Sequence, residues 1–504
     1  MNPRTAFVRK IVYLLMIGVL LGLLYWLGHP STAETPGGVL ARKRVEYKIS
    51  QTQLGQIDPT SETIKLATFG LRGVAALVLW EKANDYKTND DWTNFASTLY
   101  QIIKVQPHFV FVWIHQAWNM SYNTSVEFDD YRERYRWVIK GINYLIKGIE
   151  YNQAEPRLQW ETGWTIGQKI GRSDEHRYYR RLFKADDEFH EAHGSPPLAR
   201  RDNWLVGKEW FQDAISLADS IGKGIGGKSP LIYLSDPPMS QMNYSEAIET
   251  EGTFGEVGRR AWKTAGDEWR RYGSTPIPST YGVTVFLNDK EKEEELGKKI
   301  VAELDSLQPG LREEIREKKR KQLTPEQLAA YDTPLEKRTS EQQQLAYEAE
   351  QRLQVTHEDV ARQIKGPQHA KAKKLAEEAA AHEDTATYIS RYRDTVNFLY
   401  WRLRAEVEQS DDALDARKFI YQGDRAFHDG DPTAAKAAYD QGFALWRKVI
   451  DKFPAFIDDD VTGSDMMDLV KQYQRTLKQL DEPFPENFIL KDVVARYGKK
   501  PGEQ

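Results

Sequence analysis

The apolar residues of this chain recur at helical spacing, and Val, Ile and Thr nowhere alternate with polar residues over the length of a strand. A strand with one buried face requires that alternation, so the pattern argues against a sheet. Polar caps and prolines divide the pattern into segments, as Asp91 and Pro107 do for one of them. The sequence therefore predicts an all-α protein. Helices are expected at 61–86, 91–106, 108–122, 129–151, 156–170, 173–193, 204–220, 243–251 and 254–272, with an irregular loop at 222–238.

The N-terminal segment 11–27 contains 17 uncharged, mostly aliphatic residues, and Arg4, Arg9 and Lys10 precede it. As a helix it would extend about 26 Å, close to the ~30 Å hydrocarbon core of a bilayer. Positive charges ahead of such a segment favour a cytoplasmic N-terminus. We therefore expect one transmembrane helix that anchors the chain in an inner membrane, with the body outside the cytoplasm.

A cleavable signal peptide is the alternative, because Ser31, Thr32 and Ala33 offer small residues at a suitable spacing. The apolar part of a signal peptide usually spans ~7–15 residues, which is shorter than 11–27 and favours the uncleaved anchor. Cleavage near Ala33 would give a secreted or periplasmic protein. Both interpretations export the body.

Charge and composition exclude several classes of protein. The chain has no cysteine, which removes disulfides, zinc ribbons, thiol catalysis and iron–sulfur ligation. Its net charge of -5 and the lack of a basic stripe argue against nucleic-acid binding. No phosphate-binding loop, dinucleotide fingerprint or nucleophile elbow is present. The sequence thus predicts no cofactor, no metal and no catalytic residue, and no enzyme activity.

Composition also divides the chain into regions. Eleven of the 14 tryptophans lie between Trp80 and Trp269, whereas the stretch 285–385 is rich in Lys, Glu, Gln and Ala. The predicted regions are a tail with a transmembrane helix (1–28), a linker (29–60), an aromatic-rich helical-repeat domain (61–280), a charged helical spacer (285–385), a C-terminal helical domain (386–480) and a tail (481–504).

Residues 416–454 resemble a tetratricopeptide repeat. Small and aromatic residues fall at the repeat's positions, and the turn 429–432 follows the first helix. The positions are Gly423, Ala426, Gly430, Ala435, Tyr439 and Gly442. Small residues on facing helices allow close approach, and large ones such as Tyr439 fill the remaining gaps. The resemblance implies an α-solenoid of helical hairpins. It also implies a partner-facing set consisting of Arg417, Ile420, Asp424, Phe427 and His428.

A second resemblance covers 66–269. The stretches KLATFGLRGVAALVLWEKAN, NMSYNTSVEFDDYRERYRWVIKGI, EPRLQWETGW and RRDNWLVGKEW are similar to a family of membrane-anchored planctomycete-type bacterial proteins that carry the label "iron responsive element". This resemblance implies a membrane-tethered repeat protein without a known reaction. No residue in these stretches supports recognition of RNA or of iron.

Residues 156–170 carry two tryptophans and two glycines, each pair four residues apart. Trp160 and Trp164 would form a stripe beside a groove of Gly163 and Gly167, into which a neighbouring helix could pack. Aromatic residues at helical spacing normally belong to a core. The functional alternative is a cleft in which the rings stack a sugar or a cofactor, with Glu161 as a general acid.

The segment DDEFHEAHG offers the best metal-ligand spacing. On a helix, Asp186, His190 and His193 would share a face. The spacing differs from that of zinc proteases, and a charged helix end in solvent is the favoured interpretation.

The sequence supports two hypotheses about the function of the chain. The first is a membrane-tethered protein-interaction scaffold or adaptor, bound to the membrane through 11–27 and to a partner protein through its helical hairpins. The alternative is a metal-binding protein or enzyme that uses Asp186, His190 and His193 or a Trp-lined cleft.

Overall fold

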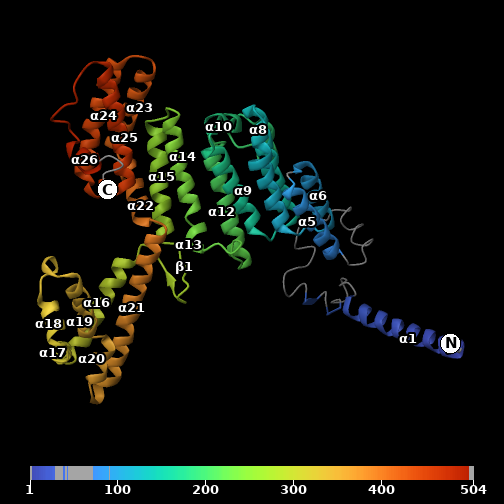
Figure 1. Cartoon of the computed structure of the whole chain (residues 1–504), viewed down its shortest axis with the longest axis horizontal. Helices are drawn as coiled ribbons and strands as arrows, with labels where there is room; N and C mark the ends of the chain where they lie inside the picture. Colours follow the sequence, from blue (N-terminus) through green and yellow to red (C-terminus); the bar gives the residue numbers. More distant parts are fainter. Residues whose placement is uncertain (1–2, 29–37, 40–41, 44–71, 90, 499–504) are drawn as a thin grey trace. The chain divides into compact units, whose positions relative to one another are not determined.

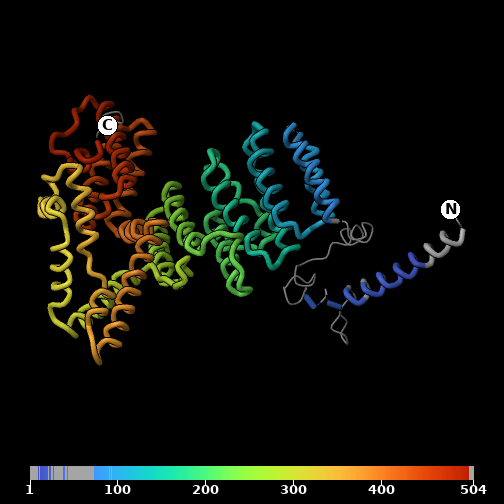
Figure 2. The backbone as a smooth tube through the Cα atoms, turned by 60° about the horizontal axis from the view of Figure 1, so that its bottom comes forward, coloured from blue at the N-terminus to red at the C-terminus, as the bar shows by residue number. Residues whose placement is uncertain are grey.

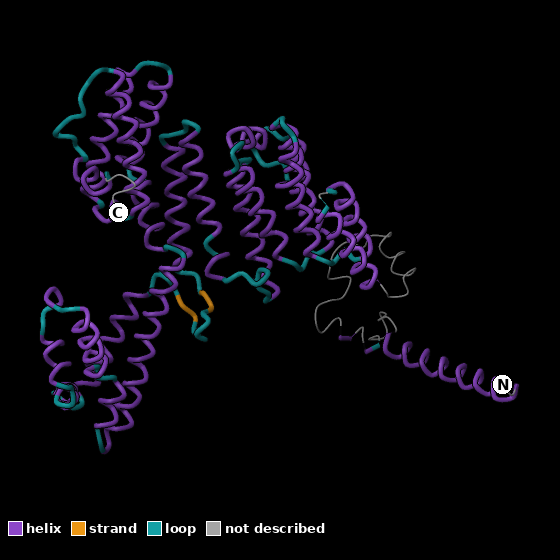
Figure 3. The backbone as a smooth tube through the Cα atoms, in the orientation of Figure 1, coloured by secondary structure: helices purple, strands orange, loops and turns teal. Residues whose placement is uncertain are grey.

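The computed structural model describes residues 3–28, 38–39, 42–43, 72–89 and 91–498. The chain divides into two compact units, unit 1 (1–229 and 239–244) and unit 2 (230–238 and 245–504). In the described residues, the strands are two antiparallel dipeptides, β1 (Ile277–Pro278) and β2 (Thr284–Val285), and helices dominate the rest (Figure 3). The predicted all-α class is confirmed.

Helix α1 (Pro3–Gly28) contains the predicted transmembrane segment 11–27. Among the described residues, no helix is both long enough and apolar enough to cross a membrane. The transmembrane part of the fold prediction therefore has no support here. Most of the linker predicted at 29–60, including the cleavage position near Ala33, lies outside the described residues.

Unit 1 is a series of helices in which most pack against the next one along the chain (Figure 1). They are α5 (Arg72–Thr88), α6 (Trp92–Val105), α7 (Val110–Trp118), α8 (Tyr131–Tyr151), α9 (Pro156–Thr165), α10 (His176–Lys184), α11 (Asp187–Ala192) and α12 (Asn203–Ile221). Predicted caps explain several boundaries. The Asp91 carboxylate accepts a hydrogen bond from the backbone N–H of Asn94 at 3.2 Å, and α6 ends before Pro107.

The single helix predicted at 173–193 is wrong in one respect. Its C-terminal part is divided into α10 and α11, which are separated by a break at residues 185–186. The Asp186 side chain accepts a hydrogen bond from the backbone N–H of Phe189 at 3.0 Å and so starts a new helix. The break buries Phe189 and His190.

Helices α9 and α12 approach each other through glycines. A Cβ atom on Gly163 would lie 2.7 Å from the carbonyl oxygen of Gly207, and one on Gly207 would lie 2.9 Å from the carbonyl oxygen of Gly163. Because both obstacles are backbone atoms, neither side can yield without moving a helix. The predicted glycine groove is confirmed at Gly163, and the helix that fills it is α12.

Unit 2 contains β1, β2 and the remaining helices, and its elements are traced in Figure 2. They are α13 (Pro230–Tyr233), α14 (Asp236–Thr250, of which 239–244 belong to unit 1), α15 (Glu256–Gly273), α16 (Lys290–Ser306), α17 (Leu311–Arg320), α18 (Pro325–Asp332), α19 (Ser340–Leu353), α20 (His357–Gln363), α21 (His369–Thr395), α22 (Phe398–Glu408), α23 (Asp411–His428), α24 (Pro432–Lys452), α25 (Asp460–Gln479) and α26 (Lys491–Tyr497). The loop expected at 222–238 is shorter than predicted, because α13 and the start of α14 occupy its second half.

The charged stretch 285–385 is a folded group of helices, α16 to α21, with a core of its own. Leu304, Ile315, Val360 and Ala372 are among its buried residues. Its few apolar residues gather on the facing sides of α16, α17, α20 and α21, while the charged residues remain outside. The region predicted as a charged helical spacer is therefore a folded group of helices with its own apolar core.

The C-terminal hairpin of α23 and α24 packs as its residue pattern predicts. A Cβ on Gly423 would lie 2.6 Å from the Tyr439 ring, and a Cβ on Gly442 would lie 2.8 Å from the Ile420 side chain. Gly430 occupies the turn with φ +80°, a conformation that favours glycine. The predicted tail after residue 480 joins the same core through Phe488, Leu490 and Val493.

Gly163→Ala is expected to destabilise the chain by about 1–3 kcal/mol, because the added methyl group meets the Gly207 carbonyl. Gly297→Ala is the matched control, since a Cβ on this helical glycine of α16 meets side-chain atoms at an ordinary 3.5 Å. The control should be neutral or stabilising by up to about 1 kcal/mol. Urea unfolding monitored by circular dichroism measures both, and equal effects would contradict the close contact.

Candidate functional site

Unit 1 contains a cavity of about 160 Å³ between α7, α8 and α9. Its walls are mainly aromatic and aliphatic, with one carboxyl group and one imidazole. The lining residues are Phe111, Ile114, His115, Trp118, Leu145, Glu161, Trp164 and Thr165. A concave, largely apolar site with a few convergent polar groups is the usual form of a small-ligand site.

Trp118 and Trp164, which line the cavity, belong to a row of four aromatic rings. Trp118 stacks on Tyr122 at 6.1 Å between ring centroids, Tyr122 lies 6.3 Å from Trp164, and Trp164 stacks on Trp160 at 6.5 Å. Trp160 is only 6% exposed and packs against Phe211, so it is a core residue as predicted. Trp164 is half-buried and faces the cavity, whereas Trp118 is 45% exposed.

The two helices that supply most of the lining both end in π-helical turns. Residues 119–123 form one directly after Trp118, and residues 166–170 form the other directly after Thr165. Such turns are rare and occur frequently at functional sites. The spacing of apolar residues does not distinguish a π-helical turn from an ordinary helix, so these two turns were not predicted.

The Glu161 carboxyl group is the only acid in the cavity wall, and only 17% of its side chain is exposed. Burial raises its pKa, and the positive charges of Lys228 and Arg157 partly oppose that shift. The Arg157 Nε atom lies 3.5 Å from the carboxyl oxygen, and the Lys228 Nζ atom lies 3.6 Å from the centroid of the Trp160 ring. The two cations therefore offset only part of the cost of burying the charged form of this acid.

His115 is the second polar group. Burial lowers its pKa, and the charge of Lys87 lowers it further, so the ring is neutral near pH 7. Its Nδ1 atom has no hydrogen-bond partner among the residues that the structure describes. Burial and the nearby Glu161 charge raise the pKa of Tyr122 to about 12, so its phenol is also uncharged.

The residues considered as alternative metal ligands have other roles. His190 is buried and donates through Nε2 to the Phe183 carbonyl at 2.8 Å, while His193 donates through Nδ1 to the Phe189 carbonyl at 2.5 Å. Asp186 caps α11, and its carboxylate accepts a hydrogen bond from the Tyr135 hydroxyl group, with 2.7 Å between the two oxygen atoms. Within the described residues, no three His, Asp or Glu side chains form a group able to hold a metal ion.

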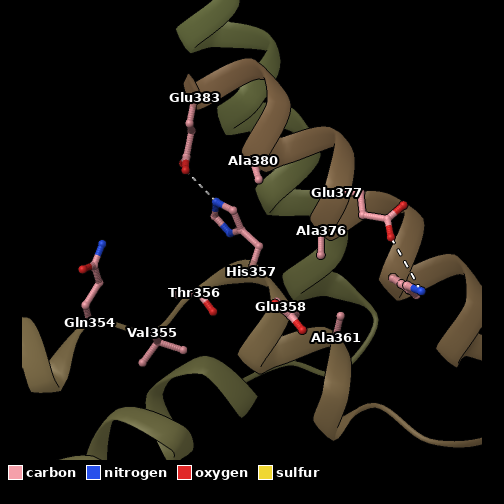
Figure 4. A pocket seen from close by; sticks show the side chains of 11 residues that line it. Gln354, Val355, Thr356, His357, Glu358, Ala361, Ala376, Glu377, Ala380 and Glu383 are labelled. Atoms are coloured by element: carbon pink, nitrogen blue, oxygen red, sulfur yellow. Dashed lines mark ion pairs between the residues drawn. The ribbon is translucent and has the colours of Figure 1, made fainter. Parts of the chain in front are cut away.

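A larger concavity of about 670 Å³ lies in unit 2 between α20 and α21 (Figure 4). The His357 side chain points toward Glu383 across it, with 2.9 Å between Nε2 and the carboxylate. Glu358 pairs with Arg362 at 2.5 Å, and Glu377 pairs with Lys373 at 3.8 Å. The Glu358, Glu377 and Glu383 side chains each remain more than half exposed, so these pairs lie in contact with solvent.

The residues proposed to face a partner on the C-terminal repeat lie in different environments. Arg417 belongs to a buried ion cluster: it bonds Glu249 at 2.6 Å and also bonds Glu408. Ile420 packs against Gly442 in the hairpin core. Phe427 is half-buried, whereas Asp424 and His428 are exposed. The Asp424 carboxylate accepts a hydrogen bond from the Tyr439 hydroxyl group at 2.7 Å, so the partner-binding prediction for this helix depends mainly on Phe427 and His428 in its last turn.

No family model matches this chain, and no curated protein matches its sequence.

Arg417→Met is expected to lower the free energy of unfolding by about 3–5 kcal/mol, because it leaves the carboxylates of Glu249 and Glu408 buried with less compensation. Arg425→Met changes an exposed arginine of the same helix and should stay within about 0.5 kcal/mol of the wild type. Chemical unfolding measures both values. An unchanged free energy of unfolding for the Arg417 variant would contradict the conclusion that Arg417 compensates these two buried carboxylates.

Proposed function

We propose that the chain is a binding protein, a helical-hairpin scaffold or adaptor held at a membrane by its N-terminal segment. Its recognition site is the aromatic surface around the cavity of unit 1. The observation that carries the proposal is the exposure of two large rings, Phe111 at 44% and Trp118 at 45%, beside a cavity that Trp164 and Glu161 also line. Aromatic anchors of this kind dominate the free energy of many interfaces.

The architecture supports a binding role. Consecutive helices that each pack on the next create extended surfaces, and such surfaces serve other helical-repeat proteins in holding partners. The exposed end of α23, with Asp424 and His428, offers a second contact surface in unit 2. The one hydroxyl side chain in the described lining of the cavity, that of Thr165, donates to the Glu161 backbone carbonyl at 2.8 Å and not to a base, which favours binding over catalysis.

The membrane tether is supported by the apolar residues of α1. Leu14, Leu15 and Val19 of this helix are each more than 60% exposed. Burying them in a bilayer would remove that apolar area from water. A tether also gives a scaffold a fixed place, so that partners meet at the membrane.

Trp118→Ala should reduce the recovery of a protein partner from membranes solubilised in mild detergent. Because Trp118 is 45% exposed, its removal should leave the fold intact while it deletes a central aromatic anchor. Tyr347→Ala removes an aromatic ring that is 59% exposed on α19 and serves as the matched control. Affinity capture followed by mass spectrometry compares the three chains. Recovery of the bait alone with the wild type would contradict the scaffold.

The full chain should remain in the membrane pellet after an alkaline carbonate wash, and a chain that lacks residues 1–28 should move to the supernatant. Buried aliphatic side chains resist this wash, whereas surface charge pairs do not. N-terminal sequencing of the pelleted protein distinguishes an uncleaved anchor from processing near Ala33. A full chain that is intact at its N-terminus and soluble would contradict the tether.

A further inference from the structure

We propose that the cavity of unit 1 binds one six-membered ring of an uncharged saccharide, with Trp118 and Trp164 against the ring and Glu161 and His115 bonded to its hydroxyl groups. The proposal rests on the proposed function, because it names the chemistry that the aromatic site recognises. The sugar belongs either to a glycosylated partner protein or to a polysaccharide.

The size of the cavity matches one ring. Its volume is about 160 Å³, and a protein cavity of about 150 Å³ is large enough to accept benzene. A saccharide ring with hydroxyl groups exceeds benzene, and the exposed edge formed by Trp118 and Phe111 leaves room for its substituents and for the next sugar of a chain. A folded peptide segment or a fused polycyclic ligand would not enter.

The aromatic walls fit the faces of a sugar ring. The C–H groups on such a face carry partial positive charge, and the face of an indole carries the negative part of its quadrupole. Trp118 of α7 and Trp164 of α9 both line the cavity, so indoles from two helices are available to the same ligand.

The charges around the cavity favour an uncharged ligand. A cation that entered would approach Glu161, but Arg157 and Lys228 lie beside that carboxyl group and would repel it. An anion would have to lose its water in a largely apolar cavity next to an acid, which is unfavourable. Hydroxyl groups avoid both penalties because they are neutral donors and acceptors.

Two polar groups are available for those hydroxyl groups. The Glu161 carboxyl group accepts hydrogen bonds, and its one charged neighbour within bonding range, Arg157, lies at 3.5 Å. His115 also lines the cavity, and its neutral ring carries one nitrogen that donates and one that accepts, as a hydroxyl group requires.

The test uses the full chain in a detergent without a sugar headgroup. Neutral tetrasaccharides of glucose and of N-acetylglucosamine are titrated against tryptophan fluorescence and by calorimetry, beside tetragalacturonate as the acidic probe and tetraglucosamine as the basic one. We expect at least one neutral probe to bind and to shift the emission. Each of Trp118→Ala and Trp164→Ala should weaken that binding about tenfold or more, because each removes a ring wall.

Two further variants keep the result interpretable. Tyr178→Ala removes a 51% exposed ring of α10 that does not line the cavity, and its affinity for the neutral probe should equal that of the wild type. Glu161→Gln leaves Arg157 and Lys228 without their counter-charge, so it should gain binding of tetragalacturonate. It should also weaken binding of the neutral probe, because the amide is a poorer hydrogen-bond acceptor than the carboxylate. Circular dichroism confirms that each variant is folded.

Absence of binding by every neutral probe would overturn the proposal, as would stronger binding of either charged probe by the wild type. Undiminished neutral binding by the folded Trp164 variant would also overturn it. Purified protein suffices for these measurements, so they can succeed where the membrane capture finds no protein partner. Periodate oxidation of the membranes then identifies the source: it abolishes capture when the partner carries the sugar, and it leaves capture unchanged when the ligand is a separate polysaccharide.

Discussion

The reciprocal contact between Gly163 and Gly207 determines how the centre of unit 1 is built. The carbonyl oxygen of each glycine occupies the space that a Cβ atom on the other would need. Helices α9 and α12 therefore approach more closely than a larger residue at either position would allow. That close approach leaves no room for large side chains between the two helices at this point. The bulky residues of α9 must lie to either side of the crossing, where Trp160 packs against Phe211 and Trp164 turns toward the cavity.

The same arrangement explains why a buried acid is tolerated at the cavity. Glu161 lies between the two tryptophans in sequence and half a turn from Gly163 on α9. Burial disfavours its charged form, and Arg157 one turn earlier on the same helix offsets part of that cost. The helix that carries the close contact thus also supplies the ring, the acid and its counter-charge.

The sequence was sufficient for features that depend on neighbouring residues. Asp91 caps α6 as expected, and Pro107 follows the end of that helix. Features that depend on distant residues were missed. The cavity joins Phe111 and Trp118 of α7 to Trp164 of α9, and no spacing rule brings those segments together. The core beneath the charged stretch 285–385 was missed for a related reason, since its apolar residues are sparse within each helix and become a cluster only after packing.

Two buried carboxyl groups, those of Glu408 and Glu161, differ in how completely the protein pairs them with cations. Glu408 in unit 2 bonds Arg417, lies 3.7 Å from Arg404, and is almost fully buried, so its oxygens are taken by the protein. Glu161 has one arginine at 3.5 Å and faces a cavity. A fully paired acid stabilises the packing of helices and has nothing left to offer a ligand, because a buried charge needs all its partners. A partly paired acid beside open space keeps an oxygen for an incoming donor, which is why the aromatic cavity, and not the ion cluster, is the site to test.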